Sequence, residues 1–209
     1  MRNVLCFGDS NTWGYRADTH TRYEWGIRWT SILQEKLEDK EIRIIEEGLC
    51  GRTTVFEDEL RIGRSGSKVL PILLEAHAPI DTVILMLGTN DCKTIYNASA
   101  AVIGKGIECL LTQIKRYAPD SKVLLLSPIR LGERVWEDGF DPEFSERSVE
   151  VSLELPTVYR EIARKHNIEY LAASDYAAPS PVDMEHLDAA GHKALADAVY
   201  HKLSAMLFS

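Results

Sequence analysis

Short apolar runs alternate along the chain with longer segments in which apolar residues recur at helical spacing. The runs cover residues 4–7, 42–45, 83–87 and 123–126, and glycine or Ser-Pro follows shortly after each. Because they carry no polar alternation, they are typical of strands buried on both faces of a parallel sheet. Helical spacing is clearest over residues 29–37, 103–114 and 194–206. The alternation predicts an α/β fold, a three-layer α/β/α sandwich around a parallel sheet of about five strands.

One stretch interrupts this pattern. Residues 131–155 are acidic, carry Trp136, Phe140 and Phe144, and are expected to form a long irregular insertion. Loops of that length in a compact domain are usually functional. The chain shows no internal repeat, linker or low-complexity segment, and 209 residues are near the size of one domain. We therefore expect residues 1–209 to form a single domain.

Charge and composition narrow the possible partners. The net charge is −8 and lysine and arginine form no basic stripe, so nucleic acid is not expected to bind. No stretch approaches the roughly 20 apolar residues that a bilayer span needs, and the first apolar run is too short for a signal peptide. These features predict a cytoplasmic protein that does not bind membranes. Cys6, Cys50, Cys92 and Cys109 lack the spacing of a metal site and are expected to be free, buried thiols.

Polar residues follow three of the predicted strands. Asp9, Ser10 and Asn11 come directly after the first strand, Gly51 after the second and Asn90 after the third. Ligands bind an open parallel sheet beyond the carboxyl ends of its strands, where these residues would meet. A serine there could be a nucleophile, although Asp-Ser-Asn also forms ordinary turns. Asn90 could donate a hydrogen bond to an oxyanion, and Gly51 would let a backbone N–H approach a ligand closely.

A serine nucleophile needs a base, and histidine is the first candidate. His186 lies in a loop just before the last predicted helix, with Asp183 three residues earlier. That spacing allows the carboxylate to orient the imidazole. His166, His192 and His201 fall within or beside predicted helices and are interpreted as structural or surface residues.

Four ordered sequence blocks together resemble the SGNH or GDSL hydrolase family. The blocks are Gly8-Asp9-Ser10-Asn11, Gly48-Leu49-Cys50-Gly51-Arg52-Thr53-Thr54, Gly88-Thr89-Asn90-Asp91 and Asp183-x-x-His186. Further agreement at Asn11-Thr12-Trp13-Gly14 and Arg28-Trp29-Thr30 makes the chain similar to the arylesterase and acyltransferase branch. Two positions depart from the family pattern: Cys50 stands where serine is common, and Met184-Glu185 replaces a glycine-containing pair.

The resemblance implies a flavodoxin-like topology and a cofactor-free serine esterase. Ser10 would attack the acyl carbonyl, His186 would act as its base, and Asp183 would orient the imidazole. The backbone N–H groups of Ser10 and Gly51 and the amide of Asn90 would form the oxyanion hole.

The resemblance also guides the expected substrate. Small esters with short acyl chains, of the acetyl or aryl type, are expected, with some transfer of the acyl group to alcohols. A carbohydrate O-acetylesterase, or a lysophospholipase or thioesterase, is an alternative within the same family. Asp9, Asn11 and Trp13, which flank Ser10, are candidate substrate-binding residues, and a homo-oligomer is expected.

Two other folds offer alternative explanations of the same residues. An α/β-hydrolase would need a Gly-x-Ser-x-Gly elbow after a central strand, and the chain has none. A flavodoxin-like nucleotide-binding module also has a polar loop after its first strand. Asp9 would repel a phosphate in that loop, and this alternative gives Asn90, Asp183 and His186 no role.

Overall fold

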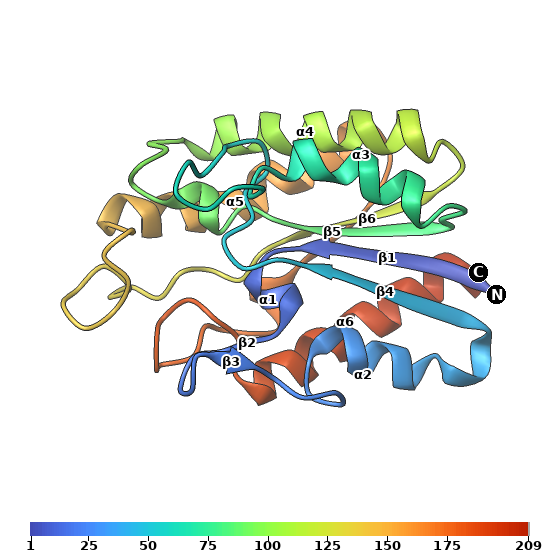
Figure 1. The fold of residues 1–209 in the computed structure, drawn as a ribbon, viewed down its shortest axis with the longest axis horizontal. Coiled ribbons are helices and arrows are strands. Elements are labelled where there is room, and N and C mark those ends of the chain that lie inside the picture. The colour runs from blue at the N-terminus through green and yellow to red at the C-terminus, as the bar shows by residue number, and fades with distance from the viewer. Residues whose placement is uncertain (209) are drawn as a thin grey trace.

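A five-stranded parallel sheet forms the centre of the computed structural model, which describes residues 1–208 (Figure 1). Its strand order is β4-β1-β5-β6-β7, the flavodoxin-like order. The strands are β1 (Arg2–Gly8), β4 (Ile42–Gly48), β5 (Thr82–Met86), β6 (Lys122–Ser127) and β7 (Glu169–Ala172). The predicted fold and its parallel sheet are confirmed.

Helices cover both faces of the sheet, as Figure 1 shows. One face carries α3 (Gly66–Ala76), α4 (Ala100–Tyr117) and α5 (Glu146–His166), and the other carries α2 (Trp29–Lys36) and α6 (Ala189–Phe208). Alternate residues of β1 explain the two layers of core. Leu5 and Phe7 pack on the α4 side, and Val4 and Cys6 on the α6 side, all four fully buried. Side chains that alternate across a strand must be apolar on both faces when both are covered.

The helix α4 shows how the sequence pattern becomes packing. Ile103, Ile107 and Ile114 recur at helical spacing and are buried against the sheet. The side chain of Ser99 accepts a hydrogen bond from the Val102 N–H and caps the first turn. Gly104 leaves room for α5, because a Cβ there would lie 2.7 Å from a methyl of Val158.

The structure corrects the expected irregular stretch at residues 131–155. Its second part is helical, because α5 begins at Glu146 and is preceded by a capping box between Ser145 and Ser148. The first part, up to Ser145, holds turns and contributes Phe140 to the substrate-sized cavity described below. Buried Val151, Leu155, Tyr159 and Ile162 give α5 its apolar face.

The burial of the cysteines differs in part from expectation. Cys109 is exposed and Cys50 half-buried, whereas Cys6 and Cys92 are buried; all four thiols are free.

Within residues 1–208, no helix is both long enough and apolar enough to cross a membrane.

Candidate active site

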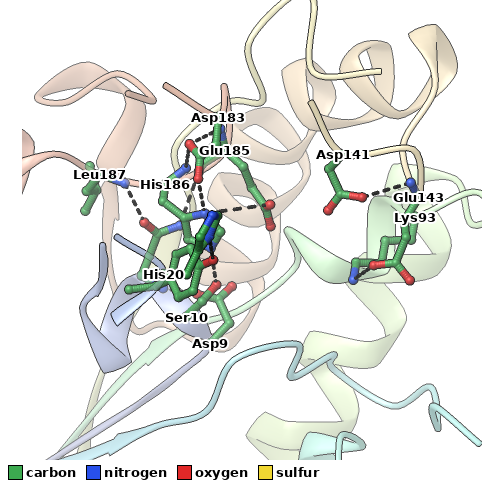
Figure 2. A network of polar contacts seen from close by, with 12 residues as sticks. Asp9, Ser10, His20, Lys93, Asp141, Glu143, Asp183, Glu185, His186 and Leu187 are labelled. Atoms are coloured by element: carbon green, nitrogen blue, oxygen red, sulfur yellow. Dashed lines mark hydrogen bonds and ion pairs between the residues drawn. The ribbon is translucent and has the colours of Figure 1, made fainter. Parts of the chain in front are cut away.

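Loops at the carboxyl edge of the sheet surround a cavity of about 670 Å³. The predicted residues Ser10, Gly51, Asn90, Asp183 and His186 all line it. They follow β1, β4 and β5 and precede α6, so the sheet topology brings together residues that are far apart in sequence. Figure 2 shows Ser10, His186 and Asp183 in line at one side of this space.

Ser10 begins a one-turn helix, α1 (Ser10–Trp13), directly beyond the end of β1. The expected loop between β1 and α2 therefore contains regular structure, including the two-stranded β2 (Tyr15–Arg16) and β3 (Thr21–Arg22). Asp9 caps α1, because its carboxylate accepts a 3.0 Å hydrogen bond from the Asn11 N–H. Gly8 is needed where the chain turns, since a Cβ there would lie 2.1 Å from the Thr12 hydroxyl.

His186 lies between Ser10 and Asp183. Its Nδ1 is 2.6 Å from Asp183 Oδ2, and its Nε2 is 2.8 Å from Ser10 Oγ. A carboxylate can only accept, so Nδ1 carries the proton and Nε2 is free to accept from the serine hydroxyl. Asp183 Oδ1 also accepts from the N–H groups of Glu185 and His186, at 3.1 and 3.0 Å, which fixes the carboxylate. The arrangement can move a proton from Ser10 to the imidazole.

Electrostatics favour a protonated imidazole more than in water. Burial alone would lower the pKa of His186, but the carboxylates of Glu185, Asp183 and Asp9 together raise it above its usual value. Burial would likewise raise the pKa of Asp183, but the hydrogen bond and charge of His186 lower it overall. Asp183 is therefore ionised beside the imidazole, where its charge would stabilise an imidazolium.

Tyr15 and Asn11 hold the imidazole in place. The Tyr15 ring packs on His186 with centroids 4.4 Å apart, and its hydroxyl is 2.7 Å from His20 Nδ1. Asn11 Oδ1 accepts a 2.9 Å hydrogen bond from the Leu187 N–H, which ties the nucleophile turn to the histidine loop. Sequence reasoning did not find Tyr15, because nothing in the sequence shows that β2 folds back over residue 186.

The three residues proposed from sequence to bind substrate lie elsewhere. Asp9, Asn11 and Trp13 are not among the residues that line the cavity. Asp9 and Asn11 are buried beneath it, where they cap α1 and bind the histidine loop. Trp13 is half-buried, and the Arg22 guanidinium lies 5.4 Å from its ring centroid.

Three residues that line the cavity offer hydrogen-bond donors: Ser10, Gly51 and Asn90. Within residues 1–208, the backbone N–H groups of Ser10 and Gly51 donate to no protein acceptor. Asn90 Nδ2 donates one hydrogen bond, 3.1 Å long, to Arg52 O and retains a second proton. Gly51 has φ of +82°, a conformation that an L side chain adopts only with strain. Unpaired donors beside a nucleophile suit a developing oxyanion.

Buried carboxyl groups fix the backbone next to these donors. Asp91 accepts hydrogen bonds from the Thr54 N–H, at 3.0 Å, and from its hydroxyl, which fixes the segment after Gly51. Burial raises the pKa of Asp91 to about 7 and that of Asp9 to about 6.

The wall opposite His186 is charged. Lys93 pairs with Glu143, and Asp141 lies beside them, as Figure 2 shows. The guanidinium of Arg61 reaches the rim next to Gly51 and donates to Cys50 O. In the part of the chain described, no cluster of three or more His, Cys, Asp or Glu side chains is arranged to hold a metal ion.

Comparison with known proteins places this geometry in a family. The model of the GDSL-like lipase/acylhydrolase family matches residues 6–194. The chain belongs to this family. The SGNH or GDSL resemblance seen in the sequence is thereby confirmed, and the protein is an esterase, a hydrolase of carboxylic esters.

Several solved esterases share the whole fold. A carbohydrate acetylesterase family member from Sinorhizobium meliloti is 36% identical, with a TM-score of 0.93 and 99% of each chain covered. A second carbohydrate acetylesterase from the same organism is 34% identical, with a TM-score of 0.90 over 99% of this chain and 100% of that one. An inhibitor-bound aryl esterase from M. smegmatis is 31% identical, with a TM-score of 0.92 over 99% and 100% of the two chains. No protein with a curated description matches this GDSL esterase.

Proposed function

We propose that this GDSL esterase hydrolyses small esters with short acyl chains, acetates above all, through an acyl-Ser10 intermediate. The observation that carries the proposal is the continuous contact from Asp183 through His186 to Ser10, at 2.6 and 2.8 Å. His186 takes the proton of the Ser10 hydroxyl as the oxygen attacks the ester carbonyl. The N–H groups of Ser10 and Gly51 and the Asn90 amide hold the oxyanion.

The second half of the reaction uses the same groups. His186 returns its proton to the departing alcohol, then takes a proton from water as the water attacks the acyl-Ser10 carbonyl. Free acid leaves and the serine hydroxyl is restored. Asp183 stabilises the imidazolium in both halves.

The cavity and the related proteins support short acyl groups. Charged side chains line much of its wall, among them Arg61, Lys93 and Asp141, and a long acyl chain would have to desolvate them. The related solved enzymes are described as carbohydrate acetylesterases and an aryl esterase. Both descriptions are compatible with an acetyl group on Ser10 and leave the alcohol half to be identified.

A series of p-nitrophenyl esters of increasing acyl length tests the proposal. We expect kcat/KM to be highest for acetate and to fall as the chain grows, and Ser10→Ala to abolish turnover. A fluorophosphonate should label Ser10 in the wild type, as mass spectrometry of the digested protein would show. Labelling at another residue, or full activity of Ser10→Ala, would refute the mechanism.

Transfer of the acyl group to alcohols forms a second part of the proposal. A cavity of about 670 Å³ is larger than an acetyl group needs and leaves space for an alcohol beside acyl-Ser10. Added alcohol should then give a new ester in competition with free acid. Chromatography that finds only free acid at every alcohol concentration would remove this part and leave the hydrolase intact.

A further inference from the structure

Glu185 is a buried carboxyl group that the mechanism above does not use. Its side chain lines the same cavity as Ser10 and His186, and the residue is only 6% exposed. The backbone fixes its position, because its N–H donates to Asp183 Oδ1 at 3.1 Å and its carbonyl oxygen accepts from Asn11 Nδ2 at 3.5 Å. In Figure 2 the Glu185 carboxyl group lies beside the His186 imidazole, on the side that faces Asp141.

No protein group satisfies this carboxyl. Within residues 1–208, no donor forms a hydrogen bond with it, and His186 Nδ1 is the one cationic atom within 4 Å, at 3.7 Å. That nitrogen already donates to Asp183 at 2.6 Å. The side-chain oxygens of Glu185 are not among the fully solvent-excluded side-chain atoms that lack a partner, so they are open to the cavity. The carboxyl is therefore available to a group that enters the cavity.

The surrounding charges indicate which kind of group. Five carboxylate residues and two cationic residues, Arg61 and Lys93, line the cavity, and Lys93 already pairs with Glu143. The carboxylates are those of Asp18, Asp141, Glu143, Asp183 and Glu185. An anionic substrate would be repelled. Burial raises the pKa of Glu185 to about 7, so near neutrality the group is often uncharged, which suits a neutral donor better than a cation.

We propose that Glu185 accepts a hydrogen bond from a free hydroxyl group on the alcohol half of the ester. This inference rests on the proposed function, because His186 must face the departing alcohol to return its proton. Glu185 Oε2 lies 3.7 Å from Nδ1, the ring nitrogen farther from Ser10, and both residues line the cavity, so a hydroxyl that extends from the ester oxygen past the edge of the imidazole would reach it. The enzyme should therefore prefer partly acetylated polyhydroxy alcohols to plain alkyl acetates of the same size.

Two pairs of matched acetates test this preference by titration of released acid. 2-Hydroxyethyl acetate and n-propyl acetate differ by a hydroxyl in place of a methyl group, and 2-methoxyethyl acetate and n-butyl acetate by an oxygen that cannot donate. Wild-type kcat/KM should favour the first member of the first pair only. Glu185→Leu should reduce that ratio about three- to tenfold, the usual effect of one lost hydrogen bond between neutral groups. Glu185→Gln should retain part of it, because the amide oxygen still accepts.

Controls separate hydroxyl recognition from other effects. Asp141→Asn removes the same charge from the facing wall and should leave the ratio unchanged. Fluorophosphonate labelling and thermal unfolding report whether each variant is folded, and Glu185→Ala replaces Glu185→Leu if the larger side chain does not fit. A kcat/KM ratio that Glu185→Leu leaves unchanged overturns the inference. If kcat/KM falls equally for both esters of the pair, the ratio is unchanged and Glu185 acts only through His186.

A cation-binding role gives a different result. Acetylcholine and 3,3-dimethylbutyl acetate have the same shape, but only the first is charged and neither donates a hydrogen bond. A preference for acetylcholine that disappears in Glu185→Gln would show that Glu185 selects positive charge, and would overturn the hydroxyl proposal. If the wild type hydrolyses no acetate and Ser10 takes no label, the proposed function itself fails and the inference with it.

Discussion

Replacing Asn90 with alanine should slow catalysis far more than it destabilises the fold. The side chain is buried and uses one amide proton to bind Arg52 O at 3.1 Å. Losing that bond should lower the free energy of unfolding by about 1 kcal/mol. The second amide proton is one of three donors proposed for the oxyanion, and removal of one such donor typically reduces kcat about 10²–10³-fold, or about 3–4 kcal/mol.

Steady-state kinetics on p-nitrophenyl acetate, with thermal unfolding of the same samples, measures both quantities. KM should change little, because the lost hydrogen bond forms only as charge develops on the carbonyl oxygen. Ser10→Ala gives the background rate. A rise in KM with kcat unchanged would mean that Asn90 binds the ground state, and a kcat within about threefold of wild type would refute the oxyanion role.

Three further changes follow from the site. The acid limb of the kcat/KM profile should lie above the usual histidine pKa, because neighbouring carboxylates raise the pKa of His186. Glu185→Gln removes one of these carboxylates and should move the acid limb to lower pH. A pH–rate profile in which the limb does not move would contradict this explanation. Gly51→Ala should lower kcat and also lower Tm by a few degrees, because φ of +82° strains any Cβ by about 1–2 kcal/mol and the strain tilts the N–H. Loss of secondary structure by circular dichroism would instead indicate a folding role. Burial raises the pKa of Asp91 to about 7. Protonated Asp91 therefore contributes fully to the free energy of unfolding below about pH 4, and this contribution falls by up to about 4 kcal/mol as the pH rises to about 7. Asp91→Asn should flatten that dependence in urea unfolding at pH 4 and pH 8, and an unchanged difference would show that another group is responsible.

Strands buried on both faces were the easiest elements to predict. Residues 4–7 form an unbroken apolar run because both sides of β1 are covered, and the sequence alone shows that. The edge strand β7 has only Leu171 and Ala172 buried and leaves almost no pattern. α5 carries Pro156 in its interior and serines on its buried face, so its helical character depends on packing against β6 and β7.

The residues of the candidate site also differ in how readily the sequence reveals them. Ser10, Asp183 and His186 stand in recognisable local sequence blocks, and a family resemblance carries such blocks across the chain. Tyr15 and Glu185 act through contacts that exist only after folding: one packs on a ring 171 positions away in sequence, and the other is an acidic residue whose burial no local pattern reveals. Sequence patterns report local chemistry, whereas burial and partnership are properties of the assembled loops.

The contact between Ser10 and His186 joins positions separated by 176 residues. During synthesis Ser10 therefore leaves the ribosome 176 residues ahead of His186. The histidine loop then needs α6 docked on α2, where His192 Nδ1 accepts from the Trp29 N–H at 3.3 Å. The hydrogen bond from Ser10 to His186 therefore forms only after α6 has docked, so the appearance of esterase activity would report that these two distant segments have come together.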